Sequence, residues 1–198
     1  MSSTARKADR NPDDYYVTPH WIVEQFLEAT MPGENKLKCQ LILGDKILDP
    51  SAGGCDKYPM TYPTVLNSMG LGDVETWDIR EDSRAERTCV DFLQTQGKAK
   101  YDTVITNPPF SLAEQFVYKA LEHVDEYGLV IMLQRLNWLG TKKRFKMWNS
   151  LPLHSVFVHH QRASFLPEQP NKKDSIEYAH FVFCKNINNK ATPNLFVI

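Results

Sequence analysis

The chain has 198 residues, of which 42% are hydrophobic, 11% aromatic and 24% charged, and its formal net charge is -1. This composition is typical of one soluble globular domain and excludes a chain that is disordered throughout. The sequence has no apolar run of about 18 residues and no charged N-terminus followed by an apolar stretch, so we expect no membrane span, no secretory signal and a cytoplasmic protein.

The first 14 residues are polar and charged, and Asn11-Pro12 is a turn signal, so residues 1–14 are predicted to be a flexible tail. Beyond the tail, short apolar runs alternate with amphipathic stretches. This alternation favours a single α/β domain over residues 15–198, with a mostly parallel sheet and helices on both faces. Helices are predicted over 21–29, 64–69, 112–124 and 142–150, and strands over 42–48, 74–77, 101–106, 129–133, 155–159 and 178–184. No helix separates the last two strands, which are expected to form a hairpin.

The best-defined helix follows Phe110. Ser111 and Glu114 have the spacing of a capping box, which predicts the start of this helix. Its apolar stripe repeats every four residues on one helical face, so we expect core positions without a chemical role. The stripe consists of Leu112, Phe116, Ala120 and Val124.

Three segments that follow strands have the residue types of a nucleotide site, and ligands of parallel α/β sheets bind at the carboxyl ends of strands. The first is the turn 49–54, Asp-Pro-Ser-Ala-Gly-Gly, whose glycines allow backbone amides to approach a ligand closely. The second is Asp78-Ile79, an acid placed to bind the two hydroxyls of a ribose. The third, after the apolar pair Cys89-Val90, is Asp91-Phe92. Their order predicts a nucleoside cofactor with its adenine near Asp91 and Phe92.

A fourth segment, Asn107-Pro108-Pro109-Phe110, is the sharpest motif. The two prolines remove two backbone donors and hold the chain extended, which leaves a site rich in acceptors. The Asn107 side-chain oxygen and the Pro108 carbonyl can accept from a planar NH2 group, and a base can stack on Phe110. Such a site would aim the nitrogen lone pair at an electrophile. The structural alternative is a strand terminator with a buried aromatic ring.

Together with Tyr15-Tyr16-Val17-Thr18-Pro19 before the first helix, these motifs follow the order found in class I S-adenosylmethionine-dependent methyltransferases that methylate the N6 amine of adenine in DNA. The chain resembles this family. The resemblance implies a Rossmann-like fold with a seven-stranded sheet whose last strand is antiparallel. It also implies direct in-line transfer without a metal, with Asn107, Pro108, Pro109 and Phe110 as catalytic residues. The residues expected to bind S-adenosylmethionine are Tyr15, Tyr16, Thr18, Pro19, Asp49, Pro50, Ser51, Ala52, Gly53, Asp78, Ile79, Asp91 and Phe92.

Charge is divided unevenly along the chain. Residues 1–126 carry 13 Lys and Arg against 21 Asp and Glu, whereas residues 127–167 carry six basic residues and no acidic one. Such a segment is typical of a surface that faces a polyanion, and equally of a solvated basic helix face. The candidate nucleic-acid contacts are Arg135, Lys142, Lys143, Arg144, Lys146 and Arg162.

Trp138, Phe145 and Trp148 are interspersed among these basic residues, either as rings for unstacked bases or as the buried face of a helix. His159 and His160 are adjacent on a predicted strand and therefore point to opposite faces. The four cysteines lack paired metal-ligand spacing. No metal site is expected.

DNA is the expected partner, in a bacterial or phage-infected cell, with no recognition domain beyond the basic segment and the loop 161–177. An unpaired adenine in RNA would suit the same tetrad. Enzymes that methylate a glutamine of release factors share a similar motif. A subunit that binds nucleic acid without turnover is a further alternative, against which the intact tetrad speaks.

Overall fold

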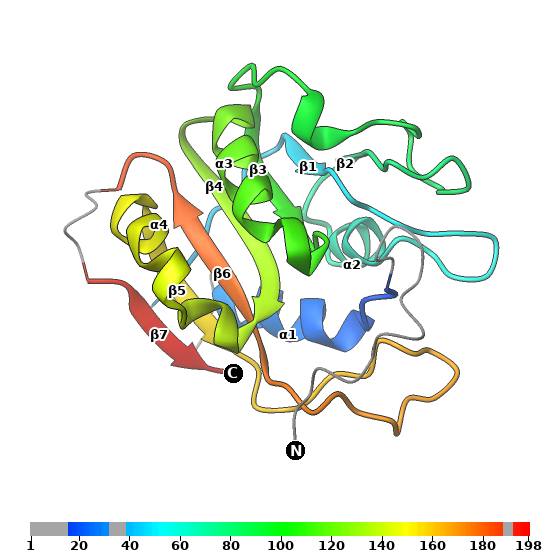
Figure 1. Ribbon diagram of the computed structural model, residues 1–198. Coiled ribbons are helices and arrows are strands. Elements are labelled where there is room, and N and C mark those ends of the chain that lie inside the picture. The colour runs from blue at the N-terminus through cyan, green and yellow to red at the C-terminus, as the bar shows by residue number, and fades with distance from the viewer. Residues whose placement is uncertain (1–15, 32–38, 188–191) are drawn as a thin grey trace.

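The computed structural model describes residues 16–31, 39–187 and 192–198, so the predicted tail 1–14 and Tyr15 lie outside the described residues. The described residues form one seven-stranded sheet with the order β2-β1-β3-β4-β6-β5-β7 (Figure 1). The strands are β1 (Ile47–Asp49), β2 (Val74–Thr76), β3 (Tyr101–Thr106), β4 (Val124–Arg135), β5 (Leu153–Val158), β6 (Tyr178–Cys184) and β7 (Asn194–Val197).

The sheet is mostly parallel, as expected from the alternation of strands and helices. Strands β2, β1, β3 and β4 pair in parallel, and β6 is antiparallel to both β4 and β5. The predicted hairpin of β5 and β6 is thereby confirmed. The antiparallel strand is the sixth along the chain rather than the last, because β7 adds a parallel strand beside β5 at the edge.

Helices cover both faces of the sheet, as the fold prediction requires (Figure 1). Neighbouring residues of a strand point to opposite faces, so Val104 packs in one core layer and Ile105 in the other. The layer with Ile105 contains α1 and α2, and the layer with Val104 contains α3 and α4. The helices are α1 (His20–Thr30), α2 (Thr61–Ser68), α3 (Ala113–His123) and α4 (Phe145–Ser150), with 3-10 turns η2 (Phe92–Gln94), η3 (Phe110–Leu112), η4 (Leu136–Leu139) and η5 (Lys142–Arg144). No helix of the described ranges is long and apolar enough to cross a membrane.

Strand β1 is shorter than the predicted strand 42–48. Gly44 has a φ of +74°, which breaks the extended backbone. The backbone nitrogens of Asp45 and Lys46 then donate to the Asp102 carboxylate at 2.9 and 2.8 Å instead of to a strand. Ile42 is consequently 83% exposed, and regular pairing begins only at Ile47.

The predicted capping box at Ser111 and Glu114 was wrong. The chain turns earlier, because the Leu112 nitrogen donates to the Pro109 carbonyl at 2.9 Å and closes a 3-10 turn that contains Ser111. Helix α3 therefore starts at Ala113 without a side-chain cap. The predicted apolar stripe is correct in part. Phe116 and Ala120 are buried on α3, whereas Val124 is buried as the first residue of β4 and Leu112 is half-buried in η3.

Candidate active site

One pocket lies at the carboxyl ends of β1 and β3. The space between its walls, its open side included, is about 940 Å³. Of the predicted cofactor and catalytic residues in the described part, every one except Pro19 lines this pocket; Pro19 directly precedes α1. The residues brought together are Tyr16, Thr18, Asp49, Pro50, Ser51, Ala52, Gly53, Asp78, Ile79, Asp91, Phe92, Asn107, Pro108, Pro109 and Phe110.

The glycine turn is fixed by Asp78. Gly53 and Gly54 have φ angles of +65° and +74°, which favour glycine. A Cβ on Gly54 would also lie 2.6 Å from the Met60 Cγ. The Gly53 nitrogen donates to Asp78 Oδ2 at 2.7 Å, and the Arg80 nitrogen donates to Asp78 Oδ1 at 2.8 Å. Each carboxylate oxygen keeps a further lone pair for a ligand.

Asp49 ends β1 and is only 1% exposed. The Thr106 hydroxyl donates to its Oδ1 at 2.7 Å and the Ser51 nitrogen at 3.2 Å. Burial nevertheless raises the pKa of the Asp49 carboxyl to about 7, because these hydrogen bonds only partly offset the lost solvation. A cationic group of a ligand placed beside this carboxyl would restore its charge.

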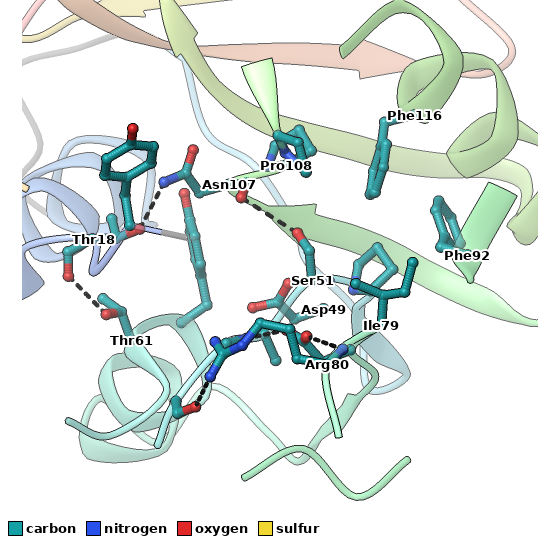
Figure 2. Close-up of a pocket in the computed structure, with 18 of the residues that line it drawn as sticks. Thr18, Asp49, Ser51, Thr61, Ile79, Arg80, Phe92, Asn107, Pro108 and Phe116 are labelled. Atoms are coloured by element: carbon teal, nitrogen blue, oxygen red, sulfur yellow. Dashed lines mark hydrogen bonds between the residues drawn. The ribbon is translucent and has the colours of Figure 1, made fainter. Parts of the chain in front are cut away.

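Asn107 follows β3 and is held at both its side chain and its backbone (Figure 2). Its amide nitrogen donates to the Thr18 hydroxyl at 2.8 Å, and its carbonyl accepts from the Ser51 hydroxyl at 3.3 Å. The Asn107 Oδ1 is buried and has no hydrogen-bond partner among the described residues. A buried acceptor without a partner costs about 1–3 kcal/mol, so it is a feature that a bound donor would satisfy.

Phe110 lies among aromatic and cationic groups. The Arg135 guanidinium lies 4.8 Å from the centroid of its ring. Phe165 is 6.4 Å away in an edge-to-face arrangement, and Tyr178 is 5.7 Å away. These contacts fix the ring of Phe110 where it lines the pocket.

Several pocket residues were not predicted from the sequence. Thr61 donates to the Thr18 carbonyl at 2.7 Å, and Arg80 donates to the Gly54 carbonyl at 3.4 Å. Phe116 was expected only in the core, yet it also lines the pocket while it packs 5.3 Å from Phe92. The apolar helical stripe could have pointed to Phe116, whereas no local pattern marks Thr61.

A buried chain of hydrogen bonds extends from the pocket wall into the core. The Tyr62 hydroxyl lies 3.0 Å from His180 Nε2, His180 Nδ1 lies 2.8 Å from His159 Nε2, and His159 Nδ1 lies 2.7 Å from Gln25 Oε1. Burial lowers the pKa of His159 to about 3 and that of His180 well below its ordinary value, so both are neutral. The prediction that His159 and His160 lie on a strand and point to opposite faces was wrong. Strand β5 ends at Val158, and both rings reach the side chain of Gln25, with His159 Nδ1 2.7 Å from Oε1 and His160 Nδ1 3.4 Å from Nε2. No group of His, Cys, Asp and Glu that could hold a metal occurs in residues 16–31, 39–187 and 192–198.

In the basic segment, residues 127–167, the arginines contact other groups, whereas the lysines form no ion pair with described residues. Arg135 stacks on Phe110, Arg144 donates to the Trp138 carbonyl at 3.3 Å, and Arg162 pairs with Glu177 at 2.7 Å. The exposed lysines form no ion pair with any described residue; they are Lys142, Lys143 and Lys146.

The three aromatic rings of this segment also separate. Trp138 is buried, and Trp148 stacks on Phe181 and Phe183 at 6.0 and 6.3 Å, so these two rings belong to the core. Phe145 is 69% exposed, so it is not part of a buried helix face.

No protein-family model and no curated protein matches the sequence. The structure is similar to a modification subunit of a putative type I restriction enzyme from Vibrio vulnificus, with a TM-score of 0.60, 14% identity, and 93% of this chain and 47% of that chain covered. It is also similar to a putative class I S-adenosylmethionine-dependent methyltransferase from Listeria monocytogenes, with a TM-score of 0.59, 17% identity, and coverage of 91% and 64%. A putative RNA methyltransferase from Pyrococcus horikoshii gives a TM-score of 0.53 at 15% identity, with coverage of 90% and 91%.

The fold is therefore that of the class I S-adenosylmethionine-dependent methyltransferases, as the sequence resemblance implied. The chain spans about half of the Vibrio subunit and just under two thirds of the Listeria protein.

Proposed function

We propose that the chain transfers a methyl group from S-adenosylmethionine to the exocyclic N6 amine of adenine in DNA. The observation that carries this proposal is the Oδ1 of Asn107, which is buried, has no hydrogen-bond partner among the described residues, and belongs to the same pocket as the ring of Phe110. An acceptor beside an aromatic ring suits a flat base that carries an NH2 group.

The residues around the glycine turn fit the proposed cofactor. Asp49 is a buried carboxyl whose charge a cationic amino group would restore, and Asp78 has lone pairs for ribose hydroxyls. Ile79 and Phe92 both line the pocket and give apolar surface for an adenine ring. When bound, the cofactor would supply an activated methyl group on a sulfonium.

The residues of this chain would catalyse the transfer by orienting the target amine and by excluding water from the pocket. Asn107 Oδ1 and the Pro108 carbonyl would accept the two amine hydrogens, which directs the nitrogen lone pair out of the base plane. Phe110 would hold the base by stacking, and the Arg135 guanidinium 4.8 Å away keeps that ring in position. An amine in a duplex is paired, so the target nucleotide must leave the stack or be single-stranded.

DNA as the substrate is supported by the basic segment and by the restriction-modification subunit among the similar structures. Lys142, Lys143 and Lys146 are exposed cations without ion pairs to described residues, as phosphate contacts would be. We further propose that residues 15–198 act as one methyltransferase domain, in the cytoplasm. RNA adenine is the second candidate, since the Pyrococcus protein of nearly the same length is named as a putative RNA methyltransferase.

Transfer of a labelled methyl group to DNA, RNA and protein, measured side by side, tests this function. The proposal predicts label in DNA, and none with the Asn107→Ala variant. Label confined to RNA would support the second candidate, and label confined to protein would overturn both nucleic-acid assignments.

A further inference from the structure

Among the residues that the structure describes, Phe145 is the only exposed phenylalanine. Its side chain is 69% exposed, whereas the two tryptophans of the basic segment, Trp138 and Trp148, pack in the core. An apolar ring in water forgoes the free energy that burial would bring. A single apolar side chain at a surface is nevertheless common, so its surroundings decide whether it marks a contact.

The backbone that carries Phe145 is fixed on both sides. The Phe145 carbonyl accepts a 2.8 Å hydrogen bond from the Asn149 side-chain amide, and Met147 in the same helix is 4% exposed. Before the helix, the Arg144 nitrogen donates to the Thr141 hydroxyl at 3.3 Å, and the Arg144 guanidinium donates to a backbone carbonyl of η4 at 3.3 Å. The ring is therefore held at the surface by a segment that is itself well packed.

This segment begins at the edge of the sheet that carries the pocket. Strands β3 and β4 are parallel, so β4 ends at the edge where Asn107 follows β3. Arg135, the last residue of β4, lies 4.8 Å from the ring centroid of Phe110 in the pocket wall. The turns η4 and η5 follow directly, and α4 leads back to β5, which is parallel to β4 and begins at the opposite edge (Figure 1). Phe145, the first residue of α4, is therefore at the end of this helix nearer the pocket.

Three lysines flank Phe145 in the chain, and we call these four residues the Phe145 patch. Lys142, Lys143 and Lys146 are exposed and form no ion pair with any described residue. The sequence has no acidic residue between positions 127 and 167. Cations without acidic neighbours attract a polyanion, and an aromatic ring among them offers a face on which its bases can stack.

The shape of the patch favours a nucleic acid over an anionic membrane. Helices that bind membrane surfaces present a broad apolar face along their length. Helix α4 has only six residues, and its other large apolar side chains, Met147 and Trp148, pack in the core. One ring among several lysines suits a single strand of nucleic acid, in which flat bases alternate with phosphates.

We propose that Phe145 stacks on an unpaired base of the DNA strand that carries the target adenine, while Lys142, Lys143 and Lys146 contact phosphates of the same strand. This inference rests on the proposed function, because it takes DNA as the substrate, and it adds a base contact outside the pocket. Bases in a duplex are covered by their neighbours, so the contact requires unstacked bases, as occur beside an extruded or single-stranded adenine. The contact tolerates any base, since every base has a flat π face.

The first measurement is the Kd of a single-stranded oligonucleotide with one adenine among thymines. Phe145→Leu keeps an apolar side chain but removes the ring, and should raise the Kd at least about fivefold, the loss of one base stack. Phe145→Trp should bind at least as tightly as the wild type. Tyr127→Leu is a matched control, because Tyr127 is 72% exposed near the start of β4, at the sheet edge opposite the pocket, and should leave the Kd unchanged.

A fully abasic strand of the same length separates stacking from other effects of the substitution, because it has the same phosphates and no bases. Phe145→Leu should bind this strand as tightly as the wild type does. The slope of log Kd against log salt should also be the same for Phe145→Leu and the wild type, since no charge is removed. An equal loss of affinity for both strands, or no loss for the strand with bases, would overturn the inference.

Vesicles with and without anionic lipid test the membrane as the other occupant of the patch. The inference predicts that Phe145→Leu does not change the binding of the chain to either kind of vesicle. Binding of the wild type to anionic vesicles that is lost in Phe145→Leu, with DNA binding unchanged, would assign the patch to a membrane and overturn the inference.

The inference and the proposed function can fail separately. If the wild type methylates no DNA and binds neither strand, the proposed function is wrong and the inference falls with it. If the wild type methylates adenine in DNA but Phe145→Leu binds the strand with bases equally well, only the role of Phe145 is wrong. A chain that methylates no DNA, yet shows the predicted loss with Phe145→Leu, would keep the stacking contact and contradict the proposed function.

Discussion

The Asp78 carboxylate accepts a 2.7 Å hydrogen bond from the backbone nitrogen of Gly53, which lies 25 residues earlier in the chain. Its other oxygen accepts from the Arg80 nitrogen at 2.8 Å. Asp78 thus joins the turn after β1 to the loop after β2, and both lie against the pocket. The cofactor half of the site is held in shape by a side chain that we also propose to contact the ribose.

Asp78→Asn should therefore weaken both folding and cofactor binding. An amide has one acceptor oxygen, so one of the two backbone N–H groups loses its partner, at about 1–3 kcal/mol of unfolding free energy. Urea unfolding measures this loss, and calorimetry with a cofactor analogue should show affinity lowered at least about tenfold. The exposed Glu81→Gln removes one charge from the same loop as a control. Equal behaviour of the two variants would contradict the proposed role.

Asp49→Asn should change how stability depends on pH in the cofactor-free protein. Burial raises the pKa of Asp49 to about 7. Between about pH 4 and 7 the folded protein keeps a proton that the unfolded chain has released, so stability falls as pH rises through this range. Asparagine keeps an acceptor for Thr106 and carries no charge. The variant should gain on the wild type as pH rises, by up to about 4 kcal/mol at pH 8. Unfolding curves at pH 5 and 8 measure the difference, and a gain equal at both would exclude this cause.

Asn107→Ala should abolish methyl transfer and leave cofactor binding nearly unchanged. It removes the free acceptor that we propose for the amine, and loss of one oriented catalytic hydrogen bond costs about 100-fold or more in rate. Labelled transfer and calorimetry with a cofactor analogue check the two halves of this prediction. The exposed Asn67→Ala is a matched control. Activity of Asn107→Ala within a few-fold of the wild type would count against the mechanism.

Lys142→Gln, Lys143→Gln and Lys146→Gln combined should weaken DNA binding and flatten its salt dependence. Each phosphate contact contributes about 0.9 to the slope of log K against log salt, so the slope should fall by about 2 to 3. Lys46 and Lys98 are exposed and precede β1 and β3, at the ends of these strands opposite the pocket, so both can be changed to Gln as a control and the effects compared per lysine. A slope that fell equally in both sets would locate the contact elsewhere.

Much of the candidate site could be predicted because its residues directly follow strands. Asp49 and Asn107 end apolar runs, and a parallel sheet brings such ends to one edge. Thr61 was missed because its role depends on a contact with Thr18, 43 residues away in the chain. Likewise the sequence could not separate exposed Phe145 from buried Trp138, since only tertiary packing decides which ring reaches solvent.

The start of β1 is a part of the fold that the sequence pattern also failed to predict. Leu41, Ile42 and Leu43 have strand-forming composition, but the backbone at Gly44 turns away and Asp102 binds the next two backbone nitrogens. That competing partner comes from a distant strand, so a local pattern does not reveal it. The same holds for Ser111, where the Pro109 carbonyl closes a turn before the serine can cap the helix.

The most direct measurement is the chemical identity of the methylated nucleoside. DNA is incubated with the purified chain and S-adenosylmethionine and digested to nucleosides, which mass spectrometry then identifies. The account predicts N6-methyladenine with the wild type and none with the Asn107→Ala variant. DNA that stays unmodified while another acceptor gains the methyl group, or a product methylated on a ring carbon, would contradict the account.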